Sequence, residues 1–108
     1  MYKGNKGFIL KFGDLAKTLS LEDWKTTSLE DLDSDTEWVA IVTDDAEAYF
    51  LEINAIVTRM KHPKTCFVID LHPCANYKHL QALWDNYVMT DKESVEVLLS
   101  FIHHHLVN

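Results

Sequence analysis

Two continuously apolar stretches, Trp38-Val-Ala-Ile-Val42 and Cys66-Phe-Val-Ile69, decide the fold of this chain. Neither has a polar face, which is typical of a strand covered on both sides by helices. Between them, apolar residues keep helical spacing over roughly 45–61, and His62-Pro63 ends that helix. We expect Thr43 or Asp44 to cap it. A strand, a helix and a strand within about 35 residues predict a right-handed βαβ unit with parallel strands.

The flanking sequence adds elements on both sides of this unit. Residues 7–12 alternate in the period-2 pattern of a strand at the edge of a sheet, and residues 14–35 have the pattern of short helical pieces. An amphipathic helix is predicted from Pro73 to Met89, and Thr90-Asp-Lys-Glu93 has the pattern of a capping box that opens a last helix. We therefore predict an α/β fold, a single domain over 1–108 with three to four mostly parallel strands and four to five helices.

Composition narrows the class of protein. The chain has 108 residues, 47% of them hydrophobic and 25% charged, which is ordinary for one globular domain. No apolar run approaches the roughly 20 residues of a membrane span. The first seven residues lack the apolar stretch of a signal peptide, so we expect a cytoplasmic protein with reduced cysteines. Only three glycines occur, all within the first 13 residues. Phosphate-binding glycine loops are therefore not expected at the later strand ends.

Charge is unevenly distributed along the chain. Residues 20–52 hold eleven acidic side chains against Lys25, a net charge of −10, within a chain whose net charge is −7. Residues 1–19 carry a net charge of +3, and residues 53–108 are balanced. We call residues 20–52 the acidic block. Such a block repels nucleic-acid phosphate and accelerates encounter with basic proteins. The simplest interpretation is a solvated face that maintains solubility, and the alternative is a docking face.

The docking interpretation gives a function and a site. It predicts a small non-catalytic module that binds a basic protein, as an inhibitor, immunity or antitoxin-type protein does, with no cofactor and no direct contact with nucleic acid. Trp24 is the expected hot spot, because a tryptophan ringed by acids suits the centre of an interface. Self-association stays open. The predicted contact residues are Glu22, Asp23, Trp24, Glu30, Asp31, Asp33, Asp35 and Glu37.

An enzymatic alternative rests on carboxylates at the predicted strand ends. Asp14, Asp44, Asp45 and Asp70 each follow or end a predicted strand, and the carboxyl ends of parallel strands share one edge of the sheet. Clustered carboxylates can hold Mg²⁺ for hydrolytic or phosphoryl chemistry. However, aspartate is also the ordinary residue at helix caps and strand-to-helix turns.

Histidine and cysteine suggest a weaker metal alternative. His62, Cys66, His72, Cys74 and His79 lie close enough in sequence to offer nitrogen and sulfur ligands for zinc. Their spacing matches no standard zinc finger, and Cys66 falls inside a predicted buried strand, where a free cysteine acts as a small hydrophobe.

Two short resemblances accompany these patterns. Ile41-Val-Thr-Asp-Asp45 and Val68-Ile-Asp70 resemble pieces of phospho-acceptor receiver domains, but the interval between the strands is too short and no lysine follows a later strand. The element order over 38–89 resembles that of sulfate-transporter/anti-sigma-antagonist domains, without the serine that those domains present for phosphorylation. The second resemblance implies regulation through protein–protein contact, as an analogy of fold.

Overall fold

The fold is a four-stranded parallel sheet with helices on both faces, seen in a computed structural model that describes residues 7–19, 38–60, 65–71 and 77–107. The strands are β1 (Gly7–Phe12), β2 (Trp38–Thr43), β3 (Cys66–Asp70) and β4 (Tyr87–Met89), and they lie in the order β1-β2-β3-β4 with every neighbouring pair parallel. The α/β class, the parallel sheet and the edge position of the first strand are confirmed.

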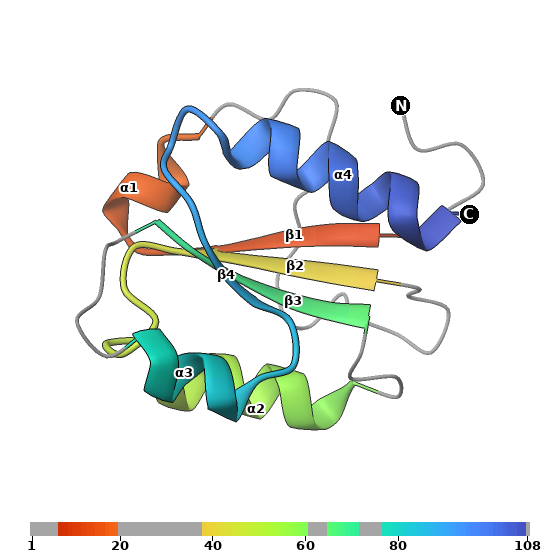
Figure 1. The fold of residues 1–108 in the computed structure, drawn as a ribbon. Coiled ribbons are helices and arrows are strands. Elements are labelled where there is room, and N and C mark those ends of the chain that lie inside the picture. The colour runs from red at the N-terminus through yellow and green to blue at the C-terminus, as the bar shows by residue number, and fades with distance from the viewer. Residues whose placement is uncertain (1–6, 20–37, 61–64, 72–76, 108) are drawn as a thin grey trace.

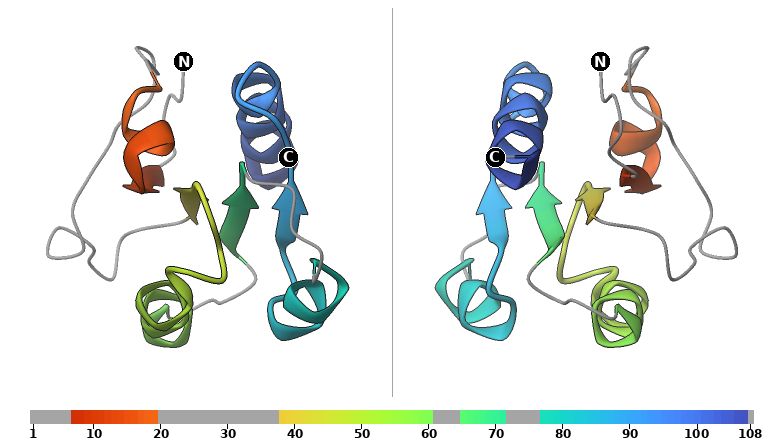
Figure 2. Two further views of the ribbon diagram at one scale, coloured as in Figure 1. Left: turned by 90° about the vertical axis from the view of Figure 1, so that its left-hand side faces the viewer. Right: turned by 90° about the vertical axis from the view of Figure 1, so that its right-hand side faces the viewer.

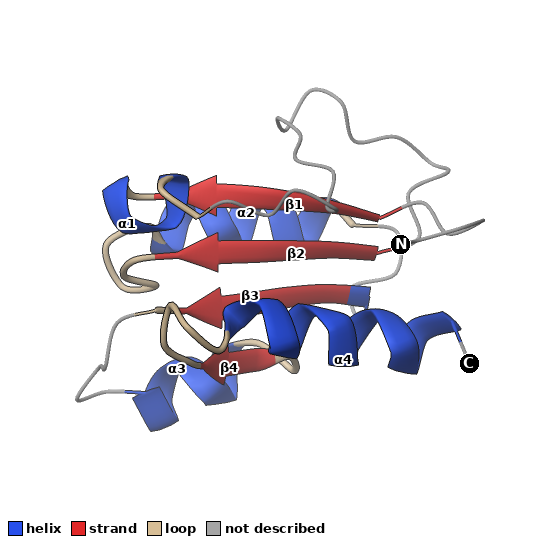
Figure 3. Cartoon of the chain, turned by 90° about the horizontal axis from the view of Figure 1, so that it is seen from above, coloured by secondary structure: helices blue, strands red, loops and turns tan. Residues whose placement is uncertain are grey.

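In the described part of the chain, four helices connect and cover the strands. They are α1 (Asp14–Lys17), α2 (Phe50–Arg59), α3 (Tyr77–Leu83) and α4 (Val95–Val107). Figures 1 and 2 show α2 and α3 side by side on one face of the sheet, with α1 and α4 on the other. Seen from above in Figure 3, the strands lie next to each other and α1 sits at the carboxyl ends of β1 and β2.

Burial on both faces explains why β2 and β3 could be recognised from sequence. All six residues of β2 are buried, and alternate side chains enter two separate cores. Trp38, Ala40 and Val42 join the core beneath α1 and α4, whereas Val39 and Ile41 join the core beneath α2 and α3. A strand with two apolar faces needs cover on both sides, and the helices supply it.

The segment that follows β3 differs from its prediction. Residues 73–89 were expected to form one helix, but the described part contains the short helix α3 and then the strand β4. Tyr87 retains helical spacing from Leu80 and Trp84 and is buried with them, yet its backbone pairs with Val68 of β3. The conformation of residues 87–89 is decided by their pairing with β3, about 20 residues earlier in the chain. The local hydrophobic periodicity does not reveal such a long-range pairing.

The start of α4 differs from the predicted capping box Thr90-Asp-Lys-Glu93. The amide of Thr90 donates to the carbonyl of Asp70, which extends the β3–β4 ladder, so Thr90 does not begin a helix. Asp91 takes the capping role, because its Oδ1 accepts the Ser94 amide at 2.8 Å. Hydrogen bonds from the Ser94 side chain and from its amide lower the pKa of Asp91. Val95, Leu99 and Ile102, which are spaced to share one face of the helix, form the buried stripe of α4.

No helix in the described ranges is long and apolar enough to cross a membrane.

Candidate functional site

The four strands end in a common row, which we call the strand-end edge. Phe12 is paired with Thr43, Thr43 with Asp70, and Asp70 with Met89, each being the last residue of its strand. Because these strands are parallel and in register, the strand ends at which Asp14, Asp44, Asp45 and Asp70 were noted share one edge of the sheet. Whether those aspartates form a site depends on what each carboxylate contacts.

Asp44 uses both carboxylate oxygens to cap α1, 28 residues earlier in the chain. Its Oδ2 accepts the Leu15 amide at 2.8 Å, and its Oδ1 accepts the Ala16 amide at 2.6 Å. The first amides of a helix have no partner within it, so a carboxylate placed there stabilises the helix. The residue before α1 is Gly13, whose φ of 99° lies in the region that favours glycine.

Asp45 begins the turn that leads into α2. Its Oδ1 accepts the amides of Glu47 at 3.0 Å and Ala48 at 3.3 Å, while its own amide donates to the Thr43 hydroxyl at 3.2 Å. The predicted cap at Thr43 or Asp44 is thus wrong. The helix α2 begins later, at Phe50, its N-cap residue Tyr49 makes no side-chain capping hydrogen bond, and Asp45 caps only the turn before it. Asp44 projects instead toward α1.

Asp70 is the most deeply placed carboxylate of the set. It has no exposed surface, and the hydroxyl of Tyr87, itself only 6% exposed, donates to its Oδ2 at 2.7 Å. A buried carboxylate needs such donors, because leaving one unpaired costs more than the hydrogen bond contributes. This contact could not be predicted from the sequence pattern, because Tyr87 lies within the segment predicted as a helix. Asp14, by contrast, is exposed in the first turn of α1.

These contacts favour the structural interpretation of the strand-end aspartates. Among the residues that the structure describes, no three or more histidine, cysteine, aspartate or glutamate side chains are grouped so that they could hold a metal ion. Asp44 and Asp45 cap backbone amides and Asp70 accepts a tyrosine hydroxyl, as aspartates at turns and in cores ordinarily do. The magnesium alternative stays a prediction, and these contacts do not favour it.

Cys66 behaves as a core residue. It is 3% exposed within β3, and burial raises the pKa of its thiol to about 12. A thiol that stays protonated is a poor nucleophile and a poor metal ligand. Of the other residues in the proposed zinc set, His79 is exposed on α3. His62, His72 and Cys74 fall outside the described residues.

The predicted docking residues all fall between residues 20 and 37, outside the described part of the chain. These are Glu22, Asp23, Trp24, Glu30, Asp31, Asp33, Asp35 and Glu37. The rest of the acidic block is described. Asp44 and Asp45 are half-buried at the carboxyl end of β2, and Glu47 and Glu52 are exposed just before and on α2.

A pocket of about 440 Å³ opens between α2 and α3. Its volume lies within the range of ligand-binding clefts. Leu83 lies on the apolar stripe of the helix predicted over 73–89, yet its side chain is 45% exposed at the pocket. The helix ends at this residue and the chain turns away into β4, so Leu83 is only partly covered. The lining residues are Glu47, Phe50, His79, Leu80 and Leu83.

Comparison of the chain with models of protein families, with curated proteins and with solved structures finds no match.

Proposed function

We propose that this protein is a small, non-catalytic binding module whose partner is a basic protein, in the manner of an inhibitor, immunity or antitoxin-type protein. One observation carries the proposal: residues 20–52 hold a net charge of −10 while residues 53–108 are balanced. Acidic residues do not need to be concentrated in one segment to keep a protein soluble. On a docking surface, however, such a concentration of charge raises the association rate and the specificity for a basic partner.

The described carboxylates support a binding role over a catalytic one. The carboxylates of Asp44, Asp45 and Asp70 accept hydrogen bonds from neighbouring parts of the fold, which gives each of them a structural role. Glu47 and Glu52 extend the acidic block onto the solvent side of α2. The predicted contact residues in 20–37 complete the proposed docking surface.

The test is capture of the partner from the native host, with this chain as bait, at low salt and at about 0.5 M salt. At the higher salt the electrostatic screening length falls well below its value of roughly 8 Å at physiological ionic strength. We expect a stoichiometric basic protein that is lost at the higher salt. Binding is then measured with the purified partner. Reversal of Glu30, Asp31, Asp33 and Asp35 to lysine should abolish it at low salt.

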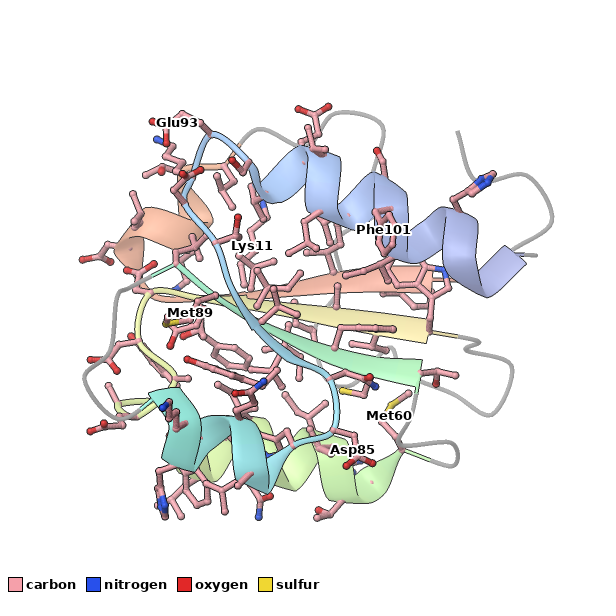
Figure 4. All side chains as sticks on the ribbon, in the orientation of Figure 1. Lys11, Met60, Asp85, Met89, Glu93 and Phe101 are labelled. Atoms are coloured by element: carbon pink, nitrogen blue, oxygen red, sulfur yellow. The ribbon has the colours of Figure 1, made fainter. Side chains whose placement is uncertain are left out.

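A matched control separates a specific surface from net charge alone. Asp33→Lys/Asp35→Lys and Glu93→Lys/Glu96→Lys change the net charge equally, but Glu93 and Glu96 lie outside the acidic block and are exposed. Figure 4 shows Glu93 before α4, on the side of the sheet away from α2 and α3. The first pair should weaken binding much more than the second. Equal effects, or no effect of reversal in the block, would contradict the proposal.

A further inference from the structure

We infer that the groove between α2 and α3 binds an amphipathic helix of the basic partner, with an apolar side chain of that helix in the pocket and a lysine or arginine beside Glu47. This inference rests on the proposed function and assigns a defined surface to it. All the lining residues that define the groove belong to the described part of the chain, and none of them is among the predicted contact residues in 20–37.

Aromatic contacts hold the groove in place. The ring of Trp84, just after α3, lies 5.4 Å from the ring of Phe50 on α2 and 6.2 Å from that of Tyr87 on β4. The Trp84 indole also donates to Asn54 Oδ1 of α2 at 3.4 Å. Because these contacts join both helices to the sheet, the groove exists before a partner arrives. A preformed groove lowers the entropic cost of binding.

Apolar side chains in and around the groove remain partly uncovered. Leu80 is buried at its base, and Leu83 on the wall is 45% exposed. Phe50, the first residue of α2, is half-buried at the pocket. Scattered apolar residues are ordinary on a protein surface, but apolar groups that gather around a concave site mark a binding groove.

The geometry of the two helices suits a third helix. In both views of Figure 2, α2 and α3 lie next to each other on one face of the sheet. Each connects two neighbouring parallel strands of the sheet, so the two helices run in the same general direction. A groove between adjacent helices accepts the ridge of apolar side chains of another helix, with anchors at positions i, i+3, i+4 and i+7.

Charge selects a basic helix over an acidic one. Glu47 forms part of the pocket wall, and it belongs to the acidic block together with Glu52, which is exposed on α2. An ammonium or guanidinium group beside the apolar anchor would meet the Glu47 carboxylate in a charge-assisted contact. The net charge of −7 disfavours an acidic partner.

The test uses a synthetic helical peptide of leucine and lysine, with the leucines at helical spacing, titrated into the isotope-labelled full-length chain and followed by NMR. We expect chemical-shift changes at the amides of Glu47, Phe50 and Leu83 and at the Trp84 indole. Leu83→Ser should weaken binding about tenfold, as expected for loss of one buried aliphatic anchor. Glu47→Gln should weaken it about threefold at low salt and have no effect at high salt.

Two controls make the outcome specific. Val97→Ser removes an aliphatic side chain that is 72% exposed on α4, across the sheet from the groove, and should leave the affinity unchanged. A peptide with glutamate in place of lysine should bind much more weakly. Shift changes confined to α4, equal binding of the acidic peptide, or no binding of either peptide would overturn the inference. Thermal unfolding of each variant verifies that it is folded. If Leu83→Ser does not fold, Leu83→Ala tests the same contact with a milder change.

The purified partner separates failure of this inference from failure of the proposed function. If charge reversal in residues 30–35 abolishes binding while Leu83→Ser leaves it intact, the groove assignment is wrong and the proposed function stands. If neither change weakens binding of the partner, both are wrong. If Leu83→Ser abolishes binding and the reversal does not, the groove binds the partner and residues 30–35 are not part of the docking surface.

Discussion

The carboxylate of Asp44 occupies the space beside Gly13 into which any other residue would project its side chain. A β-carbon placed at residue 13 would lie 2.5 Å from both Cγ and Oδ2 of Asp44. The same carboxylate holds the Leu15 and Ala16 amides, so the end of β1, the start of α1 and the end of β2 depend on one another. Gly13 and Asp44 are far apart in sequence, so this dependence could not be predicted from the sequence alone.

Gly13→Ala should therefore lower the free energy of unfolding by about 3 kcal/mol, since it combines backbone strain with steric overlap. Chemical denaturation measures the effect, and a double-mutant cycle with Asp44→Ala identifies its cause. Removing the carboxylate relieves the overlap but leaves the strain of the positive φ, so the double variant should lose less stability than the sum of the single variants. Strict additivity would show that the two side chains do not compete for space.

Asp44→Ala alone should lower the free energy of unfolding by about 1–2 kcal/mol, because two amides of α1 lose their partner. Asp14→Ala is the matched control, since Asp14 is an exposed carboxylate in the first turn of the same helix. Chemical denaturation should show the larger loss for Asp44→Ala. Equal losses would mean that Asp44 acts only through its charge near the helix terminus.

A thermal-shift comparison tests the magnesium alternative. A bound metal raises the unfolding temperature by mass action, provided that it binds the folded state preferentially. We expect Mg²⁺, Mn²⁺ and Zn²⁺ to shift the melting temperature of the wild type and of Asp44→Ala by the same small amount. A rise in the wild type that disappears in the variant would instead establish a metal site at the strand-end edge and revive the enzymatic alternative.

The elements that sequence patterns predicted correctly are those decided by local burial. The strands β2 and β3 could be located because continuous apolar runs are ordinary only where both faces of a strand are covered. The three-residue strand β4 could not, since Tyr87 fits a helical stripe equally well and only its pairing with Val68 distinguishes the two conformations. The parallel sheet itself was predicted correctly, and it puts the carboxyl ends of the strands at one edge.

What the aspartates do at that edge could not be predicted in the same way. Asp44 and Asp45 are adjacent in sequence, yet one caps a helix 28 residues earlier and the other caps the turn that follows it. Their different roles depend on the position of α1 relative to β2, which is a tertiary property. The pocket between α2 and α3 was missed for a related reason. Leu83 continues an apolar stripe in sequence, and its exposure follows from where the helix stops.

Tyr87→Phe should lower the free energy of unfolding by about 2 kcal/mol, because it removes a donor from the fully buried carboxylate of Asp70. Tyr49→Phe is the matched control. The Tyr49 ring lies 5.7 Å from that of Phe12, and its side chain is only half-buried. Urea denaturation of both variants should show a clear loss for the first and a loss of at most a few tenths of a kcal/mol for the second. Similar values for the two would indicate that the Asp70–Tyr87 hydrogen bond contributes little.

Cys66 should make the protein less stable as the solution becomes alkaline. Burial raises the pKa of its thiol from 9.0 to about 12, so between these values the unfolded chain releases a proton that the folded chain keeps. The contribution of this thiol to stability is therefore complete below about pH 9 and decreases toward pH 12, with a limiting slope of about 1.4 kcal/mol per pH unit. Comparison of Cys66→Ala with the wild type over this range isolates the effect, because Cys74 and the tyrosines are common to both. Identical slopes would mean that the thiol is not desolvated.

The same burial should limit the reactivity of Cys66. In Cys74→Ser, where Cys66 is the remaining thiol, reaction with a maleimide at pH 8 should be only as fast as the protein opens.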